Sequence, residues 1–453
     1  MSYKSFEVEI EPSILIWARE SIGMTKEKVA KLFNLSENVV SKWESGRKKP
    51  TISQIKKLAR IYRRPLAVFF LPEPPHELPL PDDFRTLPEG KKPLSSTTLL
   101  AIRRARRLQY LALELAESTD YEIQVKVGRA SISDDPEEIA NKTRIHIGID
   151  VQTQFKWKND IEAFNEWRRA IEDLGVLVLQ LPLPIEESRG FSLPNIPPVI
   201  VINAKDHIRA RIFSLFHEYG HLLLDTGGIC DWENQENQNI PSGMNGSVEK
   251  FCNYFAGAFL VPKDALLNHS LIRAEMRIVD VSDECIVKIA KDFKVSREVI
   301  LRRLVTLKLA DWDLYEMKYK KWKEKYEQKT RSKHLFNIGL NYKQYLKDGP
   351  AGKVLIDVFK RNNLTLTDDA EIIQKNDDMW EIRDKSRIFQ ITDNGIHLEI
   401  NKLKKGGQNI PLRCIRENGI PFTSLVFDSY RKGKITYNDV ADYLKIRTNI
   451  FQE

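Results

Sequence analysis

Apolar residues recur at helical spacing through the first 70 residues and predict a compact, all-helical domain at 1–70. A first helix is expected around residues 14–18. Thr25 and Ser36 are candidate N-caps of two further short helices, and Gly46 ends the second of these. A fourth helix is expected to begin at Pro50-Thr51.

The pattern changes after a proline-rich stretch at residues 71–94, which we interpret as a semi-rigid linker. Two short runs rich in β-branched residues, 175–179 and 199–202, predict strands. Helical stretches flank these runs, so the pattern predicts an α/β unit within a domain that spans residues 95–333. The expected helices are 95–117, 161–174, 204–225, 247–259, several within 264–310, and a highly charged one at 315–333.

The last part of the chain, residues 334–453, is expected to form a separate α+β module. Asp393-Asn394-Gly395 lies between two alternating apolar runs, 388–391 and 396–400, and predicts a β-hairpin. The predicted fold class is therefore multidomain, α + α/β: an all-helical domain, an α+β domain and a C-terminal α+β module.

Composition narrows the class of protein only moderately. Hydrophobic residues make up 42% of the 453 residues, which excludes wholesale disorder. The net charge of +8 permits a polyanionic partner without proving one. The four cysteines are far apart and form no CxxC pair, which argues against a disulfide framework. Without a signal region or an apolar run of membrane length, the pattern predicts a cytoplasmic protein with no membrane partner.

The segment His217-Glu218-Tyr219-Gly220-His221 carries the strongest chemical signal. Histidines four residues apart share one face of a helix and can bind one cation there. Glu218 lies beside that face, where it can take a proton from an attacking water. This H-E-x-x-H pattern predicts a Zn²⁺ centre. The alternative is a helix with two solvated or core histidines.

Glu249 is the candidate for a third metal ligand, because a catalytic zinc needs three protein ligands and one open position. It lies in a helical segment whose apolar residues would pack it against the histidine helix, where an unpaired carboxylate is costly. Asn253, one turn further, can orient a ligand. Spacing alone would equally fit an ordinary surface carboxylate at Glu249. Cys252 is a rival ligand that we interpret as a small core residue.

Two segments around these residues, 211–221 and 249–262, resemble the signature of the ImmA/IrrE metallopeptidases. The resemblance spans about residues 80–310 and continues at 406–409 and in the tail through Leu444. Cys252 stands where the family usually has alanine. The resemblance implies a zincin-like α+β domain with Glu249 as the third zinc ligand. It also implies narrow endoproteolysis of a partner repressor or antitoxin-like protein in response to stress, phage or mobile elements.

Residues 13–70 resemble the Xre/Cro-type helix-turn-helix family, with the two short capped helices joined by a tight turn at Asn34-Leu35. Such a domain places its second helix in the major groove of double-stranded operator DNA, and it often dimerises, which is the reason to expect a homodimer. The residues expected to face bases or backbone are Glu37, Asn38, Ser41 and Lys42, and those suited to phosphates are Arg47, Lys48 and Lys49.

The DNA-binding hypothesis has an alternative, a small helical bundle used for protein contacts, and Glu37 would repel phosphate. A second basic segment, residues 103–107, is interpreted as a solvated helix face. Three residues are weak candidates for stabilising an oxyanion: His207, His269 and Tyr254.

Two functional hypotheses follow. The first is a DNA-binding, zinc-dependent endopeptidase that cleaves a repressor or antitoxin-like partner, or itself within the linker at 71–94. The second is a non-proteolytic transcriptional regulator or toxin–antitoxin component that uses the zinc fold for binding or sensing. Glu218 favours the enzyme, because a purely structural zinc site does not need it. Whether residues 334–453 sense a ligand or nucleic acid stays open.

Overall fold

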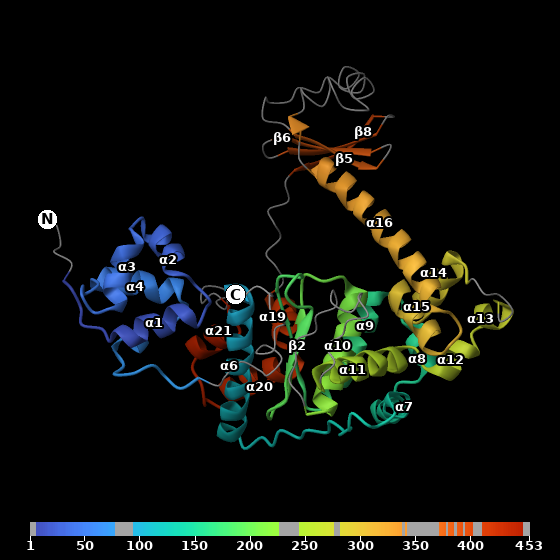
Figure 1. Cartoon of the computed structure of the whole chain (residues 1–453), viewed down its shortest axis with the longest axis horizontal. Helices are drawn as coiled ribbons and strands as arrows, with labels where there is room; N and C mark the ends of the chain where they lie inside the picture. The colour runs from blue at the N-terminus through green and yellow to red at the C-terminus, as the bar shows by residue number, and fades with distance from the viewer. Residues whose placement is uncertain are drawn as a thin grey trace. The chain divides into compact units, whose positions relative to one another are not determined.

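The computed structural model describes residues 6–77, 94–225, 244–275, 281–337, 340–341, 371–376, 379–384, 387–392, 395–401 and 410–446. The chain divides into two compact units, Met1–Leu307 with Cys414–Glu453, and Lys308–Arg413 (Figure 1). The fold is mostly helical with small sheets, which confirms the predicted multidomain α + α/β class. Among the described helices, none is long and apolar enough to cross a membrane.

The N-terminal domain is all-helical, as predicted. Thr25 caps its second helix by accepting a hydrogen bond from the Lys28 amide, and Asn34 ends that helix in the left-handed conformation, with φ of 53°. Ser36 stands at the N-cap of the third helix, but its side chain makes no capping bond. The elements are α1 (Pro12–Glu20), α2 (Lys26–Phe33), α3 (Glu37–Glu44), α4 (Ile52–Ile61) and the 3₁₀ helix η1 (Leu66–Phe70).

A buried ion pair joins two helices of this domain, which the sequence did not indicate. Arg19 of α1 donates from Nε and Nη2 to the carboxylate of Glu44 of α3, at 2.7 and 3.1 Å. Both residues are buried beside a core that includes Val40 and Trp43. The pair fixes α3, the predicted recognition helix, against α1.

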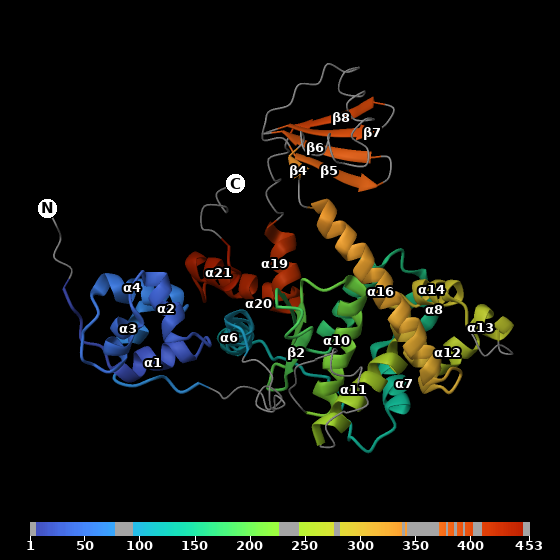
Figure 2. The ribbon, with the colours of Figure 1, turned by 45° about the horizontal axis from the view of Figure 1, so that its top comes forward.

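A three-stranded mixed sheet with the order β1-β3-β2 forms the centre of the next domain. β1 (Leu177–Leu181) pairs parallel to β3 (Val199–Asn203), and β2 (Gly190–Leu193) pairs antiparallel to β3. We did not predict β2, because a short run that contains glycine and serine lacks the apolar signal of a strand. Helix α10 (Ile208–Leu223) packs on β2 and β3, and helix α11 (Met244–Leu260) packs on α10 (Figures 1 and 2).

Side chains of neighbouring helices hold the C-terminal end of α11 in place. Arg144 donates to the carbonyl oxygen of Phe259 at 2.7 Å, and Gln154 donates to that of Leu260 at 3.0 Å. The remaining helices before the second unit are α6 (Ser96–Ser118), α7 (Pro136–Ile147), α8 (Val151–Lys156), α9 (Asp160–Glu172), α12 (Lys263–Leu267), α13 (Ser270–Glu275), α14 (Asp283–Asp292) and α15 (Arg297–Thr306).

The described residues between Lys308 and Asn401 in the second unit form one long helix and an antiparallel sheet. The predicted hairpin is present, since β7 and β8 pair antiparallel, although Asp393 and Asn394 of its turn lie outside the described residues. The sheet order is β4-β5-β6-β7-β8. The elements are α16 (Trp312–Asn337), β4 (Leu340–Asn341), β5 (Glu371–Asn376), β6 (Met379–Asp384), β7 (Arg387–Thr392) and β8 (Gly395–Asn401).

The predicted C-terminal module of residues 334–453 is divided in the structure, because the chain from Cys414 onward belongs to the first unit. The helices at this end of the chain are α19 (Ile410–Asn418), α20 (Ile420–Arg431) and α21 (Tyr437–Tyr443). Helix α20 packs on α6 and α9. Arg168 and Gln180 donate to the carbonyl oxygen of Arg416, at 2.9 and 3.1 Å. A side chain at Gly419, where φ is +84°, would meet the Glu172 carboxylate at 2.6 Å.

Candidate functional site

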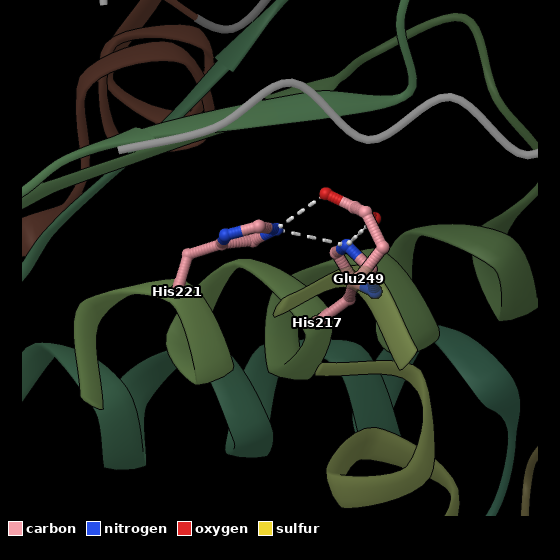
Figure 3. Close-up of side chains that lie close together, drawn as sticks. All are labelled: His217, His221 and Glu249. Atoms are coloured by element: carbon pink, nitrogen blue, oxygen red, sulfur yellow. Dashed lines mark hydrogen bonds and ion pairs between the residues drawn. The ribbon is translucent and has the colours of Figure 1, made fainter. Parts of the chain in front are cut away.

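Helix α10 holds both predicted histidines on one buried face. Every residue of the helix from Ile212 to Leu223 is buried, which suits a helix between a sheet and another helix. His217 and His221 are fully buried, and their Nε2 atoms lie 3.2 Å apart. Glu249 enters from α11, so that the carboxylate faces both imidazole rings (Figure 3).

The three side chains form a triangle with 3.2 Å along each side, in which each imidazole faces a different oxygen of the Glu249 carboxylate. Glu249 Oε2 lies 3.2 Å from His217 Nε2, and Glu249 Oε1 lies 3.2 Å from His221 Nε2. In a tetrahedral site with metal–ligand bonds of about 2.0–2.1 Å, neighbouring donors are about 3.3 Å apart. Two neutral imidazoles and one carboxylate are also an ordinary donor set for catalytic zinc. The residues therefore fit a zinc ion.

The electrostatics of the triangle keep the carboxylate of Glu249 in its ionised, metal-binding form. Burial alone raises the pKa of Glu249, but the imidazoles of His221 and His217 outweigh it and hold the pKa well below its usual value. In the absence of a metal, burial lowers the pKa of His221, but the side chains of Cys252 and Glu249 outweigh this effect and raise that pKa. Asn253 Oδ1 lies 3.0 Å from His217 Nδ1, which places the ring proton on Nδ1 and leaves the Nε2 lone pair for a metal. The structure thus brings Asn253 to the position that the sequence suggested.

Cys252 has a closer relation to the site than the sequence analysis assigned to it. It is a fully buried core residue, as interpreted, but its thiol also hydrogen-bonds to the side chain of His221. Burial raises the pKa of the thiol, so Cys252 is a neutral neighbour. Its position three residues after Glu249, on the same side of α11, is the signal that could have revealed this contact.

The side chain of Glu218 extends from α10 toward Gly190 of strand β2. The side chain is fully buried. A Cβ atom added to Gly190 of β2 would lie 3.3 Å from Glu218 Cγ and Oε1, and 2.8 Å from the carbonyl oxygen of Val201. Glycine at position 190 therefore leaves the room that the Glu218 side chain occupies next to the metal ligands.

The three candidates for an oxyanion donor have contacts elsewhere. His207 caps α10 by accepting from the Arg209 amide, and His269 pairs with Asp292 at 3.1 Å. The guanidinium of Arg303 lies over the ring of Tyr254, 5.7 Å from its centroid. Among the described residues, the only group of three or more metal-binding side chains consists of His217, His221 and Glu249.

The residues predicted to contact DNA lie along α3 and the turn that follows it. Ser41 is half-buried, and the others are exposed: Glu37, Asn38, Lys42, Arg47, Lys48 and Lys49. Lys49 forms an exposed ion pair with Glu9 at 3.0 Å, so a phosphate would compete with a carboxylate for this side chain. The turn is set by Gly46, with φ of +70°.

Comparison with protein families agrees with both sites. Residues 171–305 match the IrrE N-terminal-like domain of the M78 peptidases, and residues 15–69 match a helix-turn-helix domain. The first match contains all three candidate ligands together with Glu218, and M78 peptidases are typically metal-dependent. No curated protein and no solved structure gave a match. The chain therefore carries an N-terminal helix-turn-helix domain followed by an IrrE N-terminal-like peptidase domain. These two matches support the ImmA/IrrE architecture with a helix-turn-helix, which the sequence resembles.

Proposed function

We propose that this protein is a DNA-binding, zinc-dependent endopeptidase that cleaves a partner transcriptional repressor or antitoxin-like protein. The observation that carries the proposal is the donor triangle of His217, His221 and Glu249. Glu218 is buried beside it, on the helix that bears the two histidines. The helix-turn-helix domain in the same chain supports action at an operator.

The chemistry divides between the cofactor and the residues around it. A zinc ion held by the triangle would supply a Lewis acid that polarises a peptide carbonyl and acidifies water. Glu218 takes the proton of the attacking water and passes it to the leaving amine, so that water adds across the C–N bond as the bond breaks. Asn253 keeps the His217 ring in its metal-binding tautomer.

Strand β2 suits the binding of an extended peptide. It is an edge strand of the described sheet, and edge strands can pair with a further strand, although the four residues of β2 are buried in this structure. Gly190 of β2 touches Glu218, so a peptide paired with β2 passes the proposed general base. A strand-like site binds the middle of a chain as readily as its end, which supports endoproteolysis.

A metal analysis of the purified full chain is the first test. We expect about one zinc per chain in the wild type, and loss of zinc in His217→Ala and in Glu249→Ala. Glu218→Gln should retain zinc, because Glu218 is not part of the triangle. A wild type that takes up no zinc after reconstitution would refute the proposed centre and leave the non-proteolytic regulator as the function.

Cleavage is tested by mapping new protein N-termini in a cell extract incubated with the zinc-loaded chain. The wild type should generate a small set of new termini in DNA-binding proteins. Glu218→Gln should reduce their formation by about 10²- to 10⁴-fold, the usual contribution of a general base. Equal cleavage by both proteins would remove Glu218 from the mechanism, whereas new termini only within this chain would replace a partner by self-cleavage.

DNA binding is tested by selection of duplexes from a random pool at several salt concentrations. The double variant Arg47→Ala/Lys48→Ala should bind more weakly and show a flatter dependence of affinity on salt. With fewer phosphate contacts, fewer counterions are released from the DNA when the protein binds. The matched control, Lys56→Ala/Arg60→Ala, removes two exposed cations from α4. An unchanged salt slope in the first variant would indicate a protein-binding bundle.

A further inference from the structure

A cationic cleft lies outside the metal centre, between α6, α21 and the C-terminal end of α4. Its volume is about 450 Å³. Leucines of α6 form an apolar part of its wall, and Tyr443 of α21 adds an aromatic ring. Its charged lining residues are five cations, Arg63, Arg103, Arg104, Arg107 and Lys445, and one carboxylate, Asp442. The arginines of α6, interpreted from sequence as a solvated face, thus line a hollow.

The lining of the cleft contains more positive than negative side chains. Arg107 pairs with Asp442, the one carboxylate of the lining, and Arg104 lies 3.6 Å from Glu417. Arg103 donates from Nη2 to the carbonyl oxygen of Arg63 at 2.7 Å. Its Nη1 atom is buried and has no hydrogen-bond partner in the part of the chain that the structure describes.

The cleft lowers the pKa of two of its cations. Burial, with a smaller contribution from Arg64, lowers the pKa of Arg103 to about 10. Lys445 stays accessible to solvent at the mouth of the cleft, but its partial burial lowers its pKa to about 8, and the guanidinium groups nearby add to this effect. Concentrating cations in a partly desolvated hollow costs folding free energy, and such costs are typical of binding sites.

We propose that this cleft binds a small oligophosphate anion of the class of nucleoside di- and triphosphates. Guanidinium groups match phosphate oxygens in pairs, and a lysine adds a point charge. The volume falls within the roughly 300–1,000 Å³ that is usual for small-molecule sites, and the leucines with Tyr443 suit the apolar part of a nucleoside. Duplex DNA fits less well, because proteins read it by inserting elements into its grooves.

Such a ligand would touch the helix-turn-helix domain and the peptidase domain at once. Arg63 directly follows α4 and Tyr62, whereas Arg103 and Arg107 belong to α6. The proposal uses no residue of the metal centre, so it stands independently of the proposed peptidase activity. It gives the chain a place where a small metabolite can change how its two functional domains are held.

Isothermal titration calorimetry of the full chain with ATP and with inorganic tripolyphosphate tests the proposal. We expect wild-type dissociation constants below about 100 µM for both anions. The variant Arg107→Gln/Lys445→Gln should bind at least about tenfold more weakly, because it loses two charge-assisted contacts. Both side chains are exposed at the mouth of the cleft, and circular dichroism checks the fold. If the pair does not fold, Lys445→Gln alone should weaken binding measurably.

Matched variants locate the bound anion. Lys142→Gln/Arg431→Gln removes the same charge from exposed positions outside the cleft and should change affinity less than twofold. The proposal is overturned if the wild type binds neither anion at about 1 mM, or if both double variants lose affinity equally. It is also overturned if binding disappears in Arg47→Ala/Lys48→Ala, which would place the anion on the DNA-binding surface, or in His217→Ala, which would place it at the metal centre.

Discussion

The two ligand-bearing helices approach each other closely at Gly220 of α10, and adding a methyl group there tests how tightly packing controls the metal centre. In Gly220→Ala, the new Cβ would lie 3.2 Å from Cys252 Cα, 3.2 Å from its Sγ and 3.3 Å from its Cβ. Ordinary contacts of a Cβ atom are 3.4–4 Å, and two of the three atoms cannot rotate away. Helix α11 must therefore move by a few tenths of an ångström, and Glu249, one turn before Cys252, moves with it.

Two opposing effects set the magnitude for this variant. Replacing a helical glycine by alanine stabilises a helix by about 0.5–1 kcal/mol. Overpacking a closed interior costs about 1–3 kcal/mol, so the net change is zero to about 2.5 kcal/mol of destabilisation. Zinc sites tolerate ligand shifts of only about 0.2 Å. We therefore expect zinc affinity to fall about tenfold, on the scale of other changes near metal ligands.

Gly257 in α11 provides the matched control, because a Cβ added there meets no atom within 4 Å. Gly257→Ala should raise the stability of the metal-free chain and leave zinc affinity within twofold of the wild type. Zinc affinity is measured by competition with a chelator, and stability by thermal unfolding in excess EDTA. Unchanged zinc affinity in Gly220→Ala would refute the reasoning that the contact between the helices positions Glu249.

Two further predictions concern contacts that hold functional elements in place. Asn253→Ala should weaken zinc binding by about 10- to 100-fold in a chelator competition. Asn253→Asp should restore binding, because a carboxylate also accepts the His217 Nδ1 proton, and a failure of this rescue would contradict the positioning role. Arg19→Met leaves the Glu44 carboxylate buried without its main partner and should destabilise the helix-turn-helix domain by about 3 kcal/mol. Amide hydrogen exchange in α1 and α3 measures this loss, and Arg19→Met/Glu44→Met should recover most of it.

Local patterns predicted the elements of this protein better than their assembly. The spacing of His217 and His221 fixes their common face in any helix, and Thr25 and Ser95 fix the start of α2 and α6 through their capping bonds. Strand β2 was missed because Gly190 carries no apolar signal, although the site needs a glycine there. The spacing of Cys252 from Glu249 places both on one side of α11, but the contact of Cys252 with His221 also depends on the crossing of α10 and α11, which spacing does not give.

The assignment of the C-terminal residues failed for a similar reason. A sequence read in order assigns α19, α20 and α21 to the C-terminal module, because α16 and the second sheet separate them from the peptidase domain along the chain. The packing partners of α20 lie some 250 to 320 residues earlier in the chain, on α6 and α9. Such long-range pairing leaves no trace in spacing or composition. Only the glycine at position 419 and the apolar residues Phe422 and Val426 indicate that this segment has a packed face.

This late return of the chain has a consequence for its synthesis. The core of the helix-turn-helix domain lies almost entirely within residues 14–69, so that domain can fold soon after it leaves the ribosome. The faces of α6 and α9 are covered only when α20 emerges, roughly 20 to 70 seconds later at usual elongation rates. Each nascent chain thus passes through a period in which its helix-turn-helix domain is folded and its peptidase domain is not yet complete. A chain terminated ahead of residue 414 would stay in that state, with a folded helix-turn-helix domain and an unfinished peptidase domain.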